Sequence, residues 1–175
     1  TGEVIQQVHV PIADTDNVGI VHDKLMMLGG RLVVETVDAI IAGKVKPVPQ
    51  EEMAVVGELR PAPKIFKDTC RIDWNMPVKR IYDFIRGLSP YPAAWTELAQ
   101  PDGTVVVLKI FETEKMEQPH RFSPGTLQTD GKTYIRISGT DGWISVRALQ
   151  LPGKKRLKTD ELLRGFKLTE DYKVR

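Results

Sequence analysis

Arg71-Ile72-Asp73-Trp74-Asn75-Met76-Pro77 is the stretch that decides the fold, because the pattern of the sequence changes around it. An Asn that is able to cap a helix and a Pro near the first turn favour a helix start here. Four apolar residues then recur at helical spacing and share one face: Val78, Ile81, Ile85 and Leu88. The sequence therefore predicts an amphipathic helix after Pro77 that packs against a neighbouring sheet.

The segment after this helix has the pattern of short paired strands. Apolar and β-branched residues, which favour strands, run from Val105 to Phe111. Asp-Gly pairs at 102–103, 130–131 and 141–142 are typical of tight turns between antiparallel strands. The spacing predicts a small closed sheet, and a final helix is expected over residues 159–166, where acidic side chains fall in the first turn.

Residues 1–45 have a different pattern. Residues 4–10 alternate with apolar side chains on both faces, which predicts a strand inside an α/β sheet. Asp14-Thr15-Asp16-Asn17 offers cap oxygens for a long helix over residues 18–41, weakened at Gly29-Gly30. A helix and one strand cannot bury the apolar stripe of this helix by themselves, so we expect a partner sheet outside this chain.

A proline-rich segment separates the two patterns. Residues 46–63 hold Pro47, Pro49, Pro61 and Pro63, a composition that favours an extended, semi-rigid connector. We therefore expect three parts, namely residues 1–45, a linker at 46–63, and a domain at 64–175.

Composition limits the class of protein. A chain of 175 residues with 41% hydrophobic and 27% charged residues forms one or two domains. A lone Cys70 cannot form an internal disulfide, and no Cys or His cluster has metal-ligand spacing. With no leader pattern and no apolar stretch near 18 residues, we expect a cytoplasmic protein with no metal and no membrane contact.

Charge is distributed unevenly along the chain. Residues 1–63 carry 5 Lys and Arg against 9 Asp and Glu, whereas residues 64–175 carry 20 against 14. A basic excess is what binding to a polyanion requires, because Lys and Arg that neutralise phosphates release condensed counterions. The second part is therefore a candidate for RNA binding, and the alternative is an ordinary solvated basic surface.

Several of these motifs resemble one family. Arg71–Trp74, Trp95 with the prolines before it, Ser123–Thr126 and Leu149–Lys155 resemble the carboxy-terminal half of the methionyl-tRNA formyltransferases. The resemblance implies an α+β chain, with a remnant of a Rossmann-like formyltransferase domain followed by a barrel of oligonucleotide-binding (OB) type with flanking helices. In that family the first domain transfers a formyl group from 10-formyltetrahydrofolate, and the barrel helps to hold the methionyl initiator tRNA.

The resemblance also bears on catalysis. Thr1-Gly2-Glu3 is similar to the end of the family's Asp-Thr-Gly loop, so the expected catalytic Asp would immediately precede Thr1. We therefore expect no catalytic, cofactor-binding or metal-binding residue in this chain and no formylation by the chain alone. We also expect a monomer.

Six basic residues are the candidates for tRNA contact. Their positions are Lys64, Lys67, Lys154, Lys155, Arg156 and Lys158. The resemblance points to Lys64 in the linker, and the dense run at 153–158 suits long side chains that follow a phosphate backbone. For Lys64 the alternative is an exposed linker lysine.

Other residues have a structural interpretation. His9, His22 and His120 have no Ser, Cys or Asp at a spacing that builds a relay, so we expect them to be structural or solvated. We expect Asp73 to bond backbone or Arg71. Trp74, Trp95 and Trp143 suit base stacking, but we assign them to the core, because the chain has few other large residues to fill a barrel.

A different enzyme class stays open. Nucleotide-sugar formyltransferases and the formyltetrahydrofolate hydrolase domain share the two-domain plan and similar forms of the Arg71–Trp74 motif. Against them, the Pro152–Lys155 run and the terminal helix resemble the tRNA enzyme more closely.

Overall fold

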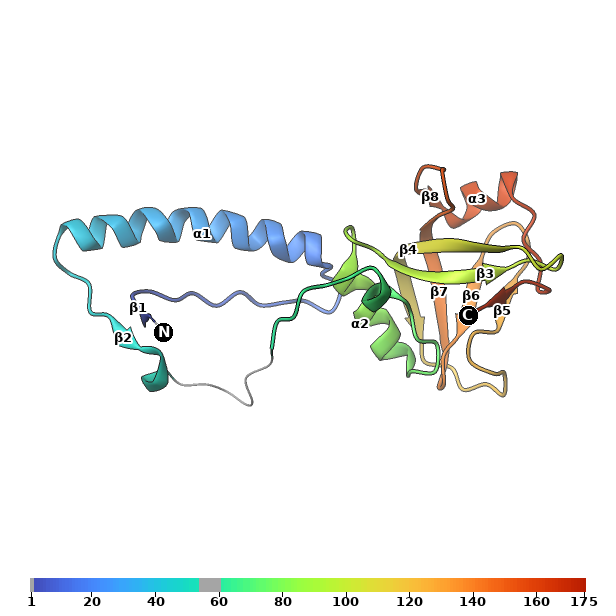
Figure 1. Ribbon diagram of the computed structural model, residues 1–175, viewed down its shortest axis with the longest axis horizontal. Helices are drawn as coiled ribbons and strands as arrows, with labels where there is room; N and C mark the ends of the chain where they lie inside the picture. The colour runs from blue at the N-terminus through green and yellow to red at the C-terminus, as the bar shows by residue number, and fades with distance from the viewer. Residues whose placement is uncertain (1, 54–60) are drawn as a thin grey trace. The chain divides into compact units, whose positions relative to one another are not determined.

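The computed structural model describes residues 2–53 and 61–175. The chain divides into two compact units, Thr1–Lys64 (unit 1) and Ile65–Arg175 (unit 2) (Figure 1). Part of the predicted linker, residues 54–60, lies outside the described residues. The three-part division expected from the sequence stays a prediction.

Unit 1 is built around one long helix. The helix α1 (Val18–Ile41) starts where the sequence predicts, because Asn17 Oδ1 accepts a hydrogen bond from the backbone N–H of Ile20 at 2.9 Å. It continues through Gly29-Gly30 without a break. Strand β1 (Glu3–Val4) pairs antiparallel with β2 (Val48–Pro49), and a short 3₁₀ turn, η1 (Gln50–Glu52), follows.

The strand predicted over residues 4–10 is wrong for most of its length. Strand β1 ends at Val4, and residues 5–13 have no regular structure. The physical reason is that a strand needs a neighbour for its backbone hydrogen bonds, and β2 provides only two residues. The helix is equally unpartnered, because no residue of α1 is buried.

Unit 2 is a mostly antiparallel sheet that curls nearly into a barrel (Figure 1). The strand order is β5-β6-β7-β4-β3-β9, and β8 pairs with β7 off this path. The elements are η2 (Asp68–Cys70), α2 (Val78–Leu88), β3 (Ala94–Ala99), β4 (Val105–Met116), β5 (Leu127–Thr129), β6 (Ile135–Ser138), β7 (Trp143–Gln150), β8 (Leu157–Lys158), α3 (Thr159–Gly165) and β9 (Lys173–Val174). The expected antiparallel sheet with helices is confirmed.

The Asp-Gly turns lie where the sequence predicts and connect paired strands. The turn at 102–103 joins β3 to β4, that at 130–131 joins β5 to β6, and that at 141–142 joins β6 to β7. Gly142 also lies against the end of β4, where a Cβ atom would come within 2.2 Å of the Met116 carbonyl oxygen. This close approach requires a residue without a side chain.

The helix α2 has the predicted buried face but a different cap. Its four buried residues are Val78, Ile81, Ile85 and Leu88, as expected. Asn75 does not cap the helix; the Val78 N–H donates instead to Asp141 Oδ1 at 2.8 Å. A carboxylate from the β6–β7 turn therefore fixes the helix start, a contact between residues 63 apart in the chain.

The last helix, α3, begins at the predicted Thr159 and ends at Gly165, one residue before the predicted end. Its first turn is held locally, since the Lys158 N–H donates to Glu161 Oε2 at 3.0 Å. Asp160 and Arg164 form an i,i+4 ion pair at 2.6 Å. The side chain of Thr159, 95% buried, donates to the Val146 carbonyl and ties the helix to β7.

Candidate nucleic-acid interface

The Arg71–Trp74 motif is part of the framework of the barrel. Trp74 is 4% exposed, and its indole N–H donates to Thr96 Oγ1 on β3 at 3.0 Å. That hydroxyl donates in turn to the Arg175 carbonyl at 2.7 Å. The motif therefore joins β3 to the end of the chain beside β9.

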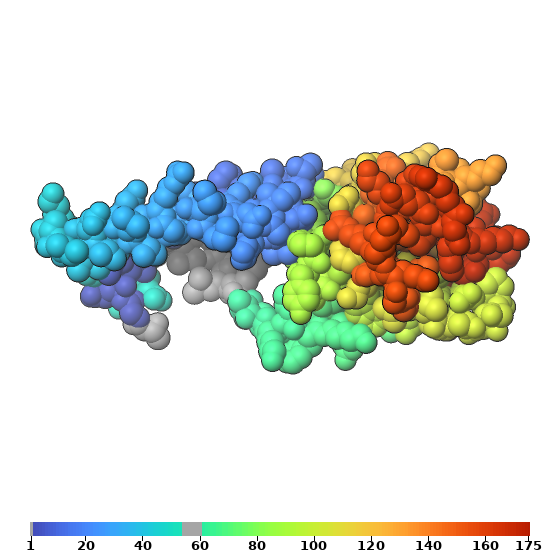
Figure 2. Space-filling view, turned by 90° about the horizontal axis from the view of Figure 1, so that it is seen from above, coloured from blue at the N-terminus to red at the C-terminus, as the bar shows by residue number. Residues whose placement is uncertain are grey.

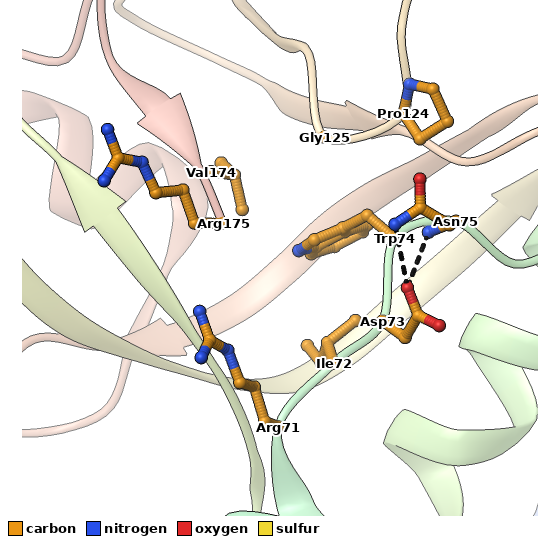
Figure 3. Close-up of a pocket in the computed structure, with 9 residues that line it drawn as sticks. All are labelled: Arg71, Ile72, Asp73, Trp74, Asn75, Pro124, Gly125, Val174 and Arg175. Atoms are coloured by element: carbon orange, nitrogen blue, oxygen red, sulfur yellow. Dashed lines mark hydrogen bonds between the residues drawn. The ribbon is translucent and has the colours of Figure 1, made fainter.

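A small polar pocket lies beside this motif (Figure 3). The guanidinium groups of Arg71 and Arg175 lie on one side of the Trp74 ring, while Asp73 and Asn75 lie on the other (Figure 3). Asp73 Oδ1 accepts from the Asn75 backbone N–H at 2.9 Å, which confirms its expected backbone bond. It does not bond Arg71, which pairs with Glu97 at 2.9 Å.

Three cross-strand neighbours build a second site on the other side of β3. Trp95 on β3 is opposite Lys109 on β4, and Lys109 is opposite Gln150 on β7. Directly opposite residues point to the same face of a sheet, so these three side chains form a row. Trp95 is half-buried and Lys109 is exposed, so this row lies at the surface.

Lys67 joins the row because Trp95 holds its backbone. The Trp95 indole N–H donates to the Lys67 carbonyl at 2.7 Å, and the Arg71 guanidinium lies 5.5 Å from the centre of the Trp95 ring. The result is an open groove of about 390 Å³, which we call the cationic groove. It is lined by Lys67, Val107, Lys109, Gln150, Leu151, Pro152 and Gly153.

A tight turn closes one end of the cationic groove. The Lys154 N–H donates to the Leu151 carbonyl at 3.1 Å, and Gln150 Nε2 donates to the Lys154 carbonyl at 2.7 Å. Gly153 has φ +68°, which favours glycine. The backbone of Lys154 is thus fixed beside the groove while its side chain is exposed.

The predicted cations differ in their surroundings. Lys67 lines the cationic groove, Lys154 adjoins it, and Lys155 and Lys158 are exposed on the segment that follows. This segment and α3 form part of the surface seen in Figure 2, coloured orange to red. Arg156 instead makes contacts within the protein, since it pairs with Glu112 and its guanidinium lies 4.7 Å over the Phe111 ring. Lys64 is exposed at the end of unit 1.

Lys109 is a groove residue that was not predicted from the sequence. A signal was available, because a single Lys interrupts the apolar run Val105–Phe111 and must point to the surface. Its partners, however, depend on the register between β3, β4 and β7, which the sequence alone does not specify.

The tryptophans and histidines largely follow the structural interpretation. Trp74 and Trp143 are buried, and Trp95 is a partly buried residue packed against the core. His120 uses both ring nitrogens on backbone groups, and His22 pairs with Asp23 at the surface. In residues 2–53 and 61–175, no group of three or more His, Cys, Asp or Glu is arranged to hold a metal ion. No helix in the same ranges has the length and apolar character of a membrane span.

A family model matches most of unit 2. Residues 64–167 match the model described as "Formyl transferase, C-terminal domain". The chain is 73% identical over 175 residues to a protein of Bacteroides fragilis named methionyl-tRNA formyltransferase, and 71% and 39% identical to proteins of that name from Bacteroides thetaiotaomicron and Porphyromonas gingivalis. These matches cover 99 to 100% of this chain and 54% of each relative. The chain therefore spans about half the length of these proteins.

Solved structures give the same fold. HypX from Aquifex aeolicus matches with a TM-score of 0.60 at 19% identity, over 89% of this chain and 27% of that chain. HypX in complex with tetrahydrofolic acid also matches with a TM-score of 0.60 at 19% identity, over 88% and 26%. At this identity the likeness shows the fold alone.

Proposed function

The chain belongs to the formyl transferase C-terminal domain family, and we propose that it is the carboxy-terminal half of a methionyl-tRNA formyltransferase. In this proposal unit 2 holds the methionyl initiator tRNA by its phosphates. The remainder of the whole protein transfers the formyl group of a folate donor, 10-formyltetrahydrofolate, to the methionyl amino group. The names and identities of the relatives support this assignment.

The cationic groove is the observation that carries the binding role. Lys67, Lys109 and Lys154 come from three separate segments; the first two line one open surface and Lys154 adjoins it. Among the described residues, no carboxylate forms an ion pair with any of the three. Cations without an internal partner are available to neutralise phosphates, and each such contact contributes to affinity through counterion release.

The groove suits a role in orientation. Its polar groups are lysine amines and a glutamine amide that is already bonded to the Lys154 carbonyl. Lysines contact phosphates as point charges, and such contacts carry no information about the base sequence. We therefore assign to unit 2 the positioning of the tRNA backbone.

We assign unit 1 to the catalytic domain of the whole protein. Many large apolar residues of α1 are exposed, among them Val33 at 63% and Val34 at 61%. Such a stripe is stable in water only when another element covers it. The proposed cover is a Rossmann-like sheet, and the length of the relatives, almost twice that of this chain, is consistent with one.

The test is a salt series. Fluorescence anisotropy would measure binding of the 175-residue chain to labelled methionyl initiator tRNA at several salt concentrations. The double variant Lys109→Gln, Lys154→Gln should reduce the slope of log affinity against log salt by about two, since each phosphate contact contributes roughly one.

A matched control comes from β9. Lys173 is exposed and lies on the strand at the other side of β3, so Lys173→Gln removes one positive charge without touching the groove. It should leave the salt slope close to that of the parent chain, whereas the double variant reduces it. The proposal is wrong if the groove variant keeps the slope of the parent chain, or if Lys173→Gln reduces it as strongly.

A further inference from the structure

A second surface site in unit 2 is built from aromatic rings and positive charge. It lies between the segment 118–122 and the strands β5, β6 and β7, and encloses an open pocket of about 380 Å³. Among the residues that the structure describes, Arg121 and Arg136 line this pocket and no Asp or Glu does. The site is separate from the cationic groove, with which it shares no lining residue.

The aromatic rings form a rigid platform. The rings of Phe122 and Trp143 meet edge to face with centres 5.3 Å apart, and His120 lies 4.7 Å from Trp143. The Phe122 N–H donates to His120 Nδ1 at 3.2 Å, so Nε2 carries the ring hydrogen and donates to the Gly142 carbonyl at 2.9 Å. The first bond fixes the backbone of Phe122 and the second fixes the ring of His120, while 49% of Phe122, a large apolar residue, is exposed.

Hydrogen-bond donors surround this platform. Arg136 lies 4.7 Å over the Trp143 ring, and its Nε donates to Gln128 Oε1 at 2.9 Å. This bond orients the Gln128 amide so that Nε2 points away from Arg136. Among the described residues, nothing accepts from Gln128 Nε2 or from the terminal guanidinium nitrogens of Arg136.

We propose that this pocket binds one unpaired nucleotide of an RNA, with the base stacked on Phe122 and the phosphate at Arg121. The assignment to RNA rests on the proposed function. The base edge, which carries acceptor atoms, would accept from Gln128 and Arg136. Stacking on an exposed aromatic ring beside arginines is how single-stranded nucleic acid is held without sequence readout.

The chemistry of the pocket separates this ligand from others. An apolar partner would leave the Gln128 and Arg136 donors without acceptors, which costs free energy. A simple anion would use the arginines but not the exposed ring of Phe122. A nucleotide satisfies the ring, the amide donors and the positive charge together.

Three indole groups allow a direct test. In an NMR titration of the 175-residue chain with an unstructured RNA trinucleotide, the indole N–H signal of Trp143 should shift. Trp74 is buried away from both sites and serves as a folding reference, while Trp95 reports on the cationic groove. Phe122→Leu should weaken the binding about tenfold while the Trp74 signal stays in place, because base stacking is lost.

Matched variants complete the design. Tyr91 is 83% exposed and lies outside the pocket, so Tyr91→Leu should leave the affinity unchanged. Arg121→Gln should weaken binding, and Lys173→Gln should not. The inference is overturned if Phe122→Leu and Tyr91→Leu behave alike, or if only Trp95 shifts. The groove variant Lys109→Gln, Lys154→Gln should leave the Trp143 shift intact, which separates a failure of the groove from a failure of this pocket.

Discussion

The two units use apolar residues in opposite ways. The 24-residue helix α1 of unit 1 buries none of its residues, whereas the 11-residue helix α2 of unit 2 buries four. Both helices start from a recognisable pattern, so periodicity predicts both equally well. The difference teaches that an apolar stripe specifies a helix and a need for a partner, while the partner itself decides whether a core forms.

The largest expected effect contrasts one core residue with one α1 residue. Ile110 on β4 is fully buried, so Ile110→Ala should lower the free energy of unfolding of unit 2 by about 2–5 kcal/mol through lost burial and a cavity. Val33→Ala, at a position 63% exposed in unit 1, should change the free energy of unfolding of unit 1 by less than about 0.5 kcal/mol. Urea unfolding followed by tryptophan fluorescence measures the change for Ile110→Ala, because all three Trp residues lie in unit 2, and circular dichroism at helical wavelengths follows α1 for Val33→Ala. Equal losses for the two variants would contradict the contrast.

Replacing two glycines by alanine should change stability in opposite directions. Gly142→Ala places a Cβ 2.2 Å from the Met116 carbonyl oxygen and should destabilise unit 2 by about 1–3 kcal/mol. Gly30→Ala in α1 meets no atom within 4 Å and should stabilise the helix by up to about 1 kcal/mol, because Ala loses less backbone entropy. Thermal unfolding followed by circular dichroism at both helical and tryptophan wavelengths would show the two shifts. A stabilising Gly142→Ala would mean that the β6–β7 turn lies farther from β4.

The smallest expected effect concerns how stability depends on pH below neutral. In the β5–β6 turn, hydrogen bonds from the Thr133 hydroxyl and from the backbone N–H groups of Thr133 and Lys132 hold the pKa of Asp130 well below its ordinary value of 3.8. A carboxyl whose pKa is lower in the folded state stabilises the fold above its unfolded pKa. This contribution is lost as the pH falls from 3.8 toward the folded pKa. Unfolding between neutral pH and about pH 2 should therefore depend less steeply on pH in Asp130→Ala than in the parent chain. Parallel pH profiles would contradict this.

The sequence predicted local structure well and tertiary partners poorly. The starts of α1, α2 and α3 and the three Asp-Gly turns follow from caps, periodicity and turn chemistry, which act within a few residues. The strand over residues 4–10 failed because its sheet neighbours are not specified by its own pattern. Asn75 was assigned a cap that Asp141 makes, since no local rule identifies a donor–acceptor pair 63 residues apart.

The candidate site shows the same limit. Lys67 and Lys154 were named from charge and from a resemblance, but only strand register brings them to a groove with Lys109. The assignment of Trp143 to the core is confirmed by its burial. The pocket beside it, with Phe122 and Arg136, was not predicted from the sequence, because its lining residues come from the segment 118–122 and from three separate strands.

The cap that Asp141 provides for α2 has a consequence for synthesis on the ribosome. The helix is translated before residue 141, so the N–H group of Val78 in its first turn exists before the carboxylate that caps it. The contact that completes the helix has a long sequence separation, and such contacts form late and slow the folding of a domain. Unit 2 is therefore built to finish folding after most of its chain has been made, and a ribosome stalled before residue 141 would present α2 without its cap.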